Sequence, residues 1–279
     1  MIERLDTTQR TWLADRLPGA ELVRDMSWNL VDTTVLHVRS GGRDFVVKAA
    51  GPDDTHLPRE ISAHPAYVEP LAVTAQAARL LDADAAARII LLEYLAGSLV
   101  LGTDAERLPD TYRQAGELLR RLHRLEMRKD AGYEERATAR ALHWLRQPHR
   151  VDATTAERTH SILSSAPTPT VQLVPTHGDW HPRNWLADGG TVRAIDFGRF
   201  AFRPASTDLA RLAAQQWRGH PELEAAFFEG YGPDPRDAEL WRLDALREAI
   251  GTACWAYKVG DEAFERQGHR MLAEALALF

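Results

Sequence analysis

The stretch THGDWHPRNW, residues 176–185, brings together four polar side chains that bind ligands in many proteins: His177, Asp179, His181 and Asn184. A glycine and a proline lie between them, which is typical of a loop. Such a loop can hold a metal ion, supply a catalytic base, or be an ordinary polar connection. The sequence on either side of it decides between these three interpretations.

A β-hairpin is predicted directly after this loop. NWLA (184–187) and TVRAIDF (191–197) have the pattern of two short strands, and two glycines between them supply the turn. Asn184 starts one strand and Asp196 ends the other, so antiparallel pairing brings their side chains to the same end of the hairpin. An amide oxygen and a carboxylate suit Mg²⁺, which takes a few hard oxygen ligands and fills the rest with water and phosphate.

Asp179, Asn184 and Asp196 follow one another at the spacing of a template for phosphoryl transfer. Asp179 precedes the hairpin, where it can face a substrate hydroxyl and accept its proton. Asn184 and Asp196 then supply the metal ligands of the template, and the protein works by positioning groups and neutralising charge. The interpretation of Asp196 as an ordinary turn residue is rejected, because it lies within IDFG and pairs with Asn184.

The template also needs a cation on the nucleotide phosphates. Lys48 lies in RDFVVKAA (43–50), among apolar residues of a predicted strand, which is an unusual place for a merely solvated lysine. Glu60, on the short helix that follows, is the expected ion-pair partner. Glu69 is the rival, although it directly precedes Pro70.

The first part of the chain is rich in predicted strands. A hairpin is expected over 31–50 and a strand, buried on both faces, over 87–95. Helices are expected over 3–17, 58–67 and 71–81.

The chain changes character after the small-residue segment AGSLVLG (96–102). Helices are predicted over 111–127, over about 134–163, and from Thr207 nearly to the end, while VQLVP (171–175) is a short strand leading into the loop. We therefore expect an α+β fold, with a β-rich lobe over 1–95, a linker over 96–102 and a helical lobe over 103–279.

The composition excludes several classes of protein. The net charge of −6 argues against nucleic acid as the main partner, and no apolar run is long enough to span a membrane. The first residues mix acids with bases and lack the apolar core of a signal peptide. A single cysteine, Cys254, allows no internal disulfide, so we expect a cytoplasmic protein.

Taken together, THGDWHPRN, the later AIDFG (194–198) and DLARL (208–212) resemble the aminoglycoside phosphotransferase family, which shares the protein-kinase-like fold with choline kinases. The resemblance covers roughly residues 25–215. It implies a bilobal kinase fold, Mg²⁺ as the metal, and ATP or GTP as the co-substrate.

The resemblance also implies a role for each matching residue. Asp179 corresponds to the catalytic base, and Asn184 and Asp196 to the metal ligands. Lys48, paired with Glu60, would bind the nucleotide phosphates. The remaining implied roles are these: a hinge for the adenine at Glu93, Tyr94 and Leu95; a γ-phosphate contact at His181; and support of the catalytic loop by His177 and Asp208.

One feature of protein kinases is missing. Protein kinases cover the nucleotide with a glycine-rich loop, whereas DMSWNLVDTT (25–34) contains no glycine. Ser27, Asn29 or backbone amides must then hold the phosphates. The chain also lacks the A-P-E motif and an evident activation segment, so a protein kinase is disfavoured.

The acceptor is inferred from charge. Acids outnumber bases in the C-terminal part, and in the resembled family this part forms the acceptor site. The candidate acceptor-binding residues are Glu229, Trp255, Asp261 and Glu262. We therefore expect a cationic antibiotic that carries a hydroxyl, either an aminoglycoside or a basic cyclic peptide such as viomycin or capreomycin.

Three alternatives stay open at this point. The chain can be a metabolic kinase of the same fold, acting on choline, an amino alcohol or a sugar. It can be a non-catalytic binding module, although such modules usually lose one of the four residues Lys48, Asp179, Asn184 and Asp196. The third is a His-x-Asp-x-His zinc site, for which the sequence offers no obvious further ligands.

Overall fold

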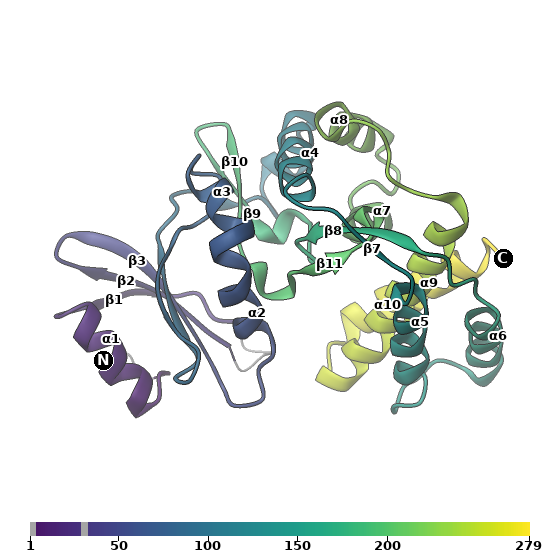
Figure 1. Ribbon diagram of the computed structural model, residues 1–279, viewed down its shortest axis with the longest axis horizontal. Coiled ribbons are helices and arrows are strands. Elements are labelled where there is room, and N and C mark those ends of the chain that lie inside the picture. Colours follow the sequence, from purple (N-terminus) through teal and green to yellow (C-terminus); the bar gives the residue numbers. More distant parts are fainter. Residues whose placement is uncertain (1–3, 29–32) are drawn as a thin grey trace. The chain divides into compact units, whose positions relative to one another are not determined.

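The computed structural model describes residues 4–28 and 33–279 (Figure 1). Its contacts divide the chain into two compact units. The first unit consists of residues 1–125, 177–201 and 222–232, and the second of residues 126–176, 202–221 and 233–279. These units differ from the lobes expected from the sequence, because the predicted catalytic hairpin returns to the first unit. The lobe boundary at 96–102 stays a prediction.

A five-stranded antiparallel sheet forms the base of the first unit. Its order is β1-β2-β3-β5-β4, and its strands are β1 (Glu21–Asp25), β2 (Thr33–Ser40), β3 (Arg43–Ala50), β4 (Leu80–Asp84) and β5 (Ile89–Glu93). The predicted hairpin and the strand over 87–95 are therefore present. Strand β1 was not predicted, because all its residues are exposed and it has no apolar face.

The two faces of this sheet are covered by different helices. Helix α1 (Thr7–Arg16) packs Trp12 and Leu13 against the face that carries Val47. Helix α2 (His56–Ala63) lies on the opposite face (Figure 1). There Leu57 packs with Ile90 and Leu92. Alternate residues of a strand point to opposite faces, so Lys48 lies on the face that α2 covers.

The helix predicted over 71–81 is wrong. A π-helical turn (His64–Val68) and the short helix α3 (Glu69–Ala72) follow α2, and the chain then enters strand β4 at Leu80. Strand β4 pairs with β5, with Leu80 opposite Leu92. The alanines of this segment favour a helix locally, but pairing along a whole sheet edge outweighs that preference.

The hairpin predicted around Gly189-Gly190 is also present. Strands β9 (Trp185–Asp188) and β10 (Thr191–Ala194) pair in antiparallel register, and the short strand β6 (Ser98–Leu99) pairs with β9.

Two helices complete the first unit, α4 (Pro109–His123) and α8 (Pro221–Tyr231). Gly116 of α4 faces the Phe227 carbonyl, and Gly230 of α8 faces the Arg113 carbonyl, so closely that neither position has room for a Cβ atom. The two helix backbones therefore touch, and the buried hydrogen bond between His123 and Tyr231 (2.9 Å) joins them further.

The second unit combines a small sheet with five helices. Its sheet has the order β11-β8-β7, with β7 (Arg128–Asp130), β8 (Val171–Thr176) and β11 (Ala201–Arg203, whose Ala201 belongs to the first unit). The helices are α5 (Tyr133–Trp144), α6 (Ala153–Ser164), α7 (Ala210–Ala214), α9 (Ala238–Val259) and α10 (Glu262–Leu276). The single polar helix expected over 134–163 is thus two helices. Leu246, Ile250 and Leu272 lie in the core between α9 and α10.

A buried charged network joins α5 to α9 in the second unit. Arg247 donates to Glu134 (2.7 Å) and to Asp244 (3.2 Å), and the Ser206 hydroxyl donates to Asp244 (3.2 Å). Burial raises the pKa of Asp244 to about 6, although Arg247 opposes the rise.

This pKa predicts a dependence of stability on pH. In the folded chain Asp244 binds a proton more tightly than in the unfolded chain, so the free energy of unfolding falls as pH rises from about 4 to about 6, by up to about 3 kcal/mol. Urea unfolding across this range, in the native chain and in Asp244→Asn, measures the effect. The variant should lose this part of the slope, and an unchanged slope would contradict the assignment.

Within the residues that the structure describes, no helix has both the length and the apolar composition needed to cross a bilayer.

Candidate active site

An ion-pair triad joins the sheet of the first unit to its hairpin. The Lys48 Nζ lies 2.8 Å and 2.9 Å from the two carboxylate oxygens of Glu60, and 3.2 Å from Oδ1 of Asp196. The predicted partner of Lys48 is thus Glu60, while Glu69 pairs with Arg79 at 3.3 Å. Glu60 is 3% exposed and Lys48 is 8% exposed, so water screens their attraction weakly.

The charges of this triad depend on one another. Burial alone would lower the pKa of Lys48, but the carboxylates of Asp196 and Glu60 outweigh it and hold that pKa above its ordinary value. The Lys48 ammonium in turn holds the pKa of Asp196 below its ordinary value. Lys48 and Asp196 therefore both stay charged at neutral pH, and an ammonium lies beside two carboxylates.

The end of the hairpin is where the sequence pattern predicted Asn184 and Asp196 to lie. Trp185 pairs with Ala194, and the next residues along each strand continue the contact, since the Ile195 N–H donates to the Asn184 carbonyl (3.0 Å). Asn184 itself ends a short 3₁₀ turn (Pro182–Asn184), one residue before β9. Asn184 and Asp196 therefore lie at the same end of the hairpin.

The loop before the hairpin is held by His177. Its Nε2 donates to the Ile195 carbonyl (3.0 Å), and its Nδ1 accepts from the Asp179 N–H (3.3 Å). One tautomer, with the proton on Nε2, satisfies both bonds. His177 thus connects the loop to the strand that delivers Asp196.

Aromatic side chains anchor the same loop. Trp180 and Trp185 are 1% and 0% exposed, with ring centroids 5.5 Å apart, and Trp180 also contacts the ring of His177 at 5.2 Å. Each buried tryptophan removes roughly 150–250 Å² from water, which is worth about 4–6 kcal/mol before entropy is counted. The polar residues between these anchors are therefore held on a rigid support.

Asp179 lies between an amide and an imidazole. The Asn184 side-chain nitrogen donates to the Asp179 carbonyl (2.8 Å) and to its Oδ2 (3.0 Å). The His181 Nε2 lies 3.5 Å from Asp179 Oδ1. His181, which was expected near the γ-phosphate, is thus a neighbour of Asp179 in this structure.

These contacts also test whether the residues fit a divalent cation. The amide nitrogen of Asn184 is used by Asp179, which leaves its side-chain oxygen as the atom for a cation. The side chain of Asp196 is 48% exposed. Its backbone has φ +68°, a conformation that residues other than glycine rarely adopt. An amide oxygen and an accessible carboxylate at one end of a hairpin are the hard ligands that Mg²⁺ takes.

The structure does not support the interpretation of the loop as a zinc site. Across residues 4–28 and 33–279, no group of three or more His, Cys, Asp or Glu side chains is placed to hold a metal ion.

The predicted nucleotide-covering segment is only partly described. The Ser27 hydroxyl accepts from the Val35 N–H (3.0 Å), so it joins the residues after β1 to β2. Asn29 lies outside the described residues.

The predicted hinge lies where β5 ends. Glu93 is the last residue of the strand and is exposed, whereas Tyr94 and Leu95 are half-buried. The ring of Tyr94 stacks on the ring of His37.

The other predicted site residues belong to other elements of the chain. Glu229 is an exposed residue of α8, in the first unit. The second unit contains Asp208, which is 2% exposed, Trp255, which contacts Phe264, and the acids of α10. Asp261 accepts from the Phe264 N–H (3.0 Å), so it caps α10, and Glu262 is exposed in the first turn.

One neighbour of the triad, His64, was not among the residues predicted from the sequence. His64 is 3% exposed, and neither of its ring nitrogens has a hydrogen-bond partner among the described residues. Burial, and then the charge of Lys48, lowers the pKa of His64 to about 4, so it stays neutral. Its position four residues after Glu60, on the same face of a helix, was the signal in the sequence.

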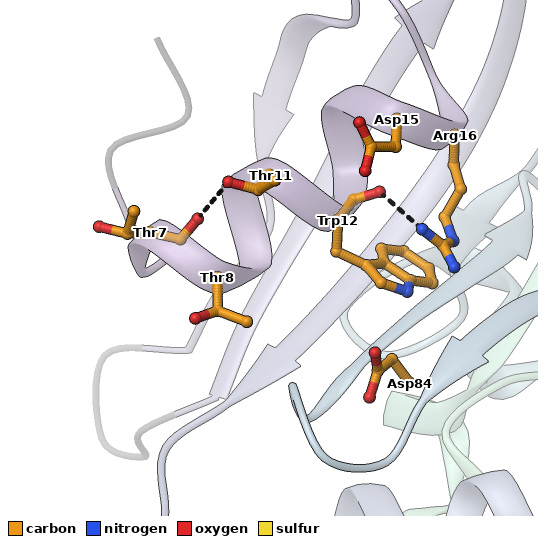
Figure 2. Close-up of a pocket in the computed structure, with 7 residues that line it drawn as sticks. All are labelled: Thr7, Thr8, Thr11, Trp12, Asp15, Arg16 and Asp84. Atoms are coloured by element: carbon orange, nitrogen blue, oxygen red, sulfur yellow. Dashed lines mark hydrogen bonds between the residues drawn. The ribbon is translucent and has the colours of Figure 1, made fainter.

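A polar hollow of about 470 Å³ lies elsewhere in the first unit (Figure 2). Helix α1 lines it with Thr7, Thr8, Thr11, Trp12, Asp15 and Arg16, and Asp84 lies opposite. The guanidinium of Arg16 covers the Trp12 ring at 4.1 Å and donates to Asp82 (2.5 Å). None of the predicted site residues lines this hollow.

Comparison with known proteins identifies the family of the chain. The model of a family described as the phosphotransferase enzyme family matches residues 29–241. No curated protein matches the chain.

Several solved structures share the fold. A thermostable mutant of aminoglycoside phosphotransferase APH(4)-Ia, in a ternary complex with ADP and hygromycin B, has a TM-score of 0.72 at 14% identity, covering 98% of this chain and 99% of that one. The choline kinase LicA from Streptococcus pneumoniae has a TM-score of 0.69 at 14% identity, with 97% and 98% covered. The macrolide 2′-phosphotransferase MphH from Brachybacterium faecium has a TM-score of 0.59 at 18% identity, with 97% and 98% covered. At these identities the likeness shows the fold alone.

Proposed function

Since this chain belongs to the phosphotransferase enzyme family, we propose that it transfers the γ-phosphate of ATP or GTP to a hydroxyl of a small cationic antibiotic. The observation that carries the proposal is the contact of Lys48 with both Glu60 and Asp196, because it places a phosphate-binding ammonium beside a metal-binding carboxylate. The protein is a small-molecule phosphotransferase, and the proposal concerns its nucleotide, its acceptor and the roles of its residues.

The nucleotide end of the reaction is assigned to the triad. Lys48 would release Asp196 and bind oxygens of the α- and β-phosphates, while Glu60 keeps the ammonium in place. Asn184 and Asp196 would hold Mg²⁺, which supplies charge neutralisation on the phosphates when it is bound. These residues lie on the sheet, α2 and the hairpin end of one unit, so the first unit carries the whole assigned phosphate site.

The chemical step is assigned to Asp179. As the acceptor oxygen forms its bond to the γ-phosphorus, the bond from that phosphorus to the bridging oxygen of the nucleotide breaks, and the hydroxyl proton passes to the Asp179 carboxylate. Asn184 orients this carboxylate through its amide N–H at 3.0 Å, and His177 holds the backbone N–H of Asp179. The nucleoside diphosphate, ADP or GDP, leaves, and the acceptor carries one phosphate.

The acceptor is proposed from charge and from the solved structures of this fold. Hygromycin B is bound in the APH(4)-Ia structure, and exposed acids occur on α8 and α10 of this chain. Aminoglycosides and basic cyclic peptides carry both the positive charge and the hydroxyl that the proposal requires. A metabolic acceptor such as choline is the competing outcome, since LicA has the same fold.

One experiment separates these acceptors. The protein is incubated with Mg·ATP and, one at a time, aminoglycosides, viomycin, capreomycin, choline, amino alcohols and sugars, and each product is examined by mass spectrometry for one added phosphate. The Asp179→Ala variant is the control for contaminating kinases. Phosphorylation of a basic antibiotic supports the proposal. Phosphorylation of choline or a sugar alone identifies a metabolic kinase, and an unchanged panel contradicts both.

Neutralising the acids at the start of α10 tests the acceptor assignment. In Asp261→Asn with Glu262→Gln, the KM for a cationic acceptor should rise about 2–5-fold per charge removed, while the KM for the nucleotide stays unchanged. Asparagine still caps the helix, so the fold is kept. The matched control is Glu239→Gln on α9. If the acceptor KM does not change at low salt, these acids do not bind the acceptor.

A further inference from the structure

An aromatic stack fastens the predicted hinge to the sheet of the first unit. The ring of Tyr94, directly after β5, lies on the imidazole of His37 in β2, with the ring centroids 4.1 Å apart and the planes 14° from parallel. His37 is 8% exposed and Tyr94 is half-buried. The two residues are far apart in sequence, so only the folded sheet brings them together.

The imidazole in this stack is fixed by a second contact. His37 Nε2 lies 2.8 Å from Oδ1 of Asp44 on the neighbouring strand β3. Arg39 donates to both oxygens of the same carboxylate, at 3.0 Å and 3.1 Å. These hydrogen bonds, first from Arg39 and then from His37, hold the pKa of Asp44 below its ordinary value. The plane on which Tyr94 rests is therefore set by an ionised aspartate.

The strand register shows which face of the sheet carries the stack. Lys48 is opposite Val35, and Val46 is opposite His37. Residues two apart on a strand point to the same face, so His37 shares the face of Lys48, about 6–7 Å further along the strand. This direction leads from the predicted phosphate end toward the end of β5.

The chain leaves the sheet where Tyr94 begins. The ladder between β3 and β5 runs to the pair Phe45 and Glu93, and the Glu93 N–H donates to the Arg79 carbonyl (2.9 Å). Beyond this point the stack on His37 joins the Tyr94 side chain to the sheet. The stack therefore helps to position the backbone that follows Glu93.

We infer that His37 and Asp44 are positioning residues for Tyr94, and that the His37–Tyr94 stack borders and aligns the site for the nucleotide base. The inference rests on the proposed function, because it takes Lys48 as the phosphate end. Loss of the stack weakens the binding of the base without changing the binding of the phosphates. An aromatic pair that only stabilises the fold has no such selectivity.

The inference is tested by titrating the purified protein with Mg·ATP, with adenosine and with Mg·tripolyphosphate, by calorimetry. In Tyr94→Ala and in His37→Leu, the affinity for Mg·ATP and for adenosine should fall roughly two- to tenfold, as expected for one aromatic pair, while tripolyphosphate binds unchanged. In the double variant the loss should be about that of one single variant, since both remove the same stack.

Two matched variants separate positioning from folding. Tyr94→Phe keeps the stack and should bind Mg·ATP like the native chain, and His37→Phe keeps the ring but not the bond to Asp44, so its loss should be smaller than that of His37→Leu. In each variant the KM for ATP should change while kcat at saturation stays within about twofold. If a His37 variant does not fold, Tyr94→Ala against Tyr94→Phe gives the same comparison.

The outcomes distinguish this inference from the proposed function. A native chain that binds Mg·ATP, together with Tyr94→Ala that binds it equally well or that loses tripolyphosphate affinity to the same extent, overturns the inference alone. A native chain that binds neither Mg·ATP nor adenosine overturns the proposed function and the inference with it.

Discussion

The Asp179→Ala variant is expected to lose on the order of 10²–10⁴-fold in kcat, because the attacking hydroxyl then has no base. The KM for the nucleotide should change little, since Asp179 hydrogen-bonds to Asn184, whereas Lys48 is held by Glu60 and Asp196. Steady-state kinetics with the acceptor found by the panel measures the first effect, and titration with Mg·ATP measures the second.

The matched control for this variant is Asp179→Asn. It keeps an acceptor oxygen for the Asn184 amide, so the loop should retain its structure while the base is removed. Both variants should therefore lose a similar factor in kcat. If Asp179→Asn keeps near-normal turnover, another group takes the proton and the assignment is wrong.

Replacing Lys48 should have the second large effect, on both activity and stability. Lys48→Met removes the ammonium from the phosphates and should reduce kcat/KM by about 10²–10³-fold. It also leaves the Glu60 carboxylate, 3% exposed, without its cation, which is expected to cost about 3–5 kcal/mol of the free energy of unfolding.

A double variant separates these two effects. In Lys48→Met with Glu60→Gln, the buried charge is removed together with its partner, so most of the lost stability should return while activity stays low. Urea unfolding and nucleotide kinetics are measured on the same preparations. If the double variant recovers activity along with stability, Lys48 has only a structural role.

Much of the fold was predictable because the strongest patterns lie in its most buried parts. The hairpin β2–β3 and the strand β5 alternate or cluster apolar residues as buried strands do, and β9–β10 is marked by its two glycines. Two of the errors fall on the edge strands of the five-stranded sheet. A helix was predicted over 71–81, where β4 begins at Leu80, and β1 was not predicted. Each is an edge strand whose pairing partner supplies more of its stability than its own sequence.

The candidate site divides in the same way. Residues close in sequence, such as Asp179 and Asn184, could be placed by spacing, and Lys48 with Glu60 by the order of a strand and a helix. The stack of His37 on Tyr94 depends on sheet register, which a single sequence does not specify at this separation. The acceptor site depends on surface charge, and the amino acid sequence does not show which of many exposed acids face a ligand.

The central claim is that one end of the hairpin delivers Asn184 and Asp196 to a single cation beside Asp179. A crystal structure with Mg²⁺ and a non-hydrolysable ATP analogue tests it most directly. We expect the side-chain oxygen of Asn184 and the Asp196 carboxylate on one ion, with Lys48 on the phosphates and Asp179 facing the γ-phosphate. A structure in which Asn184 and Asp196 point apart, with the triphosphate bound elsewhere, would contradict the account.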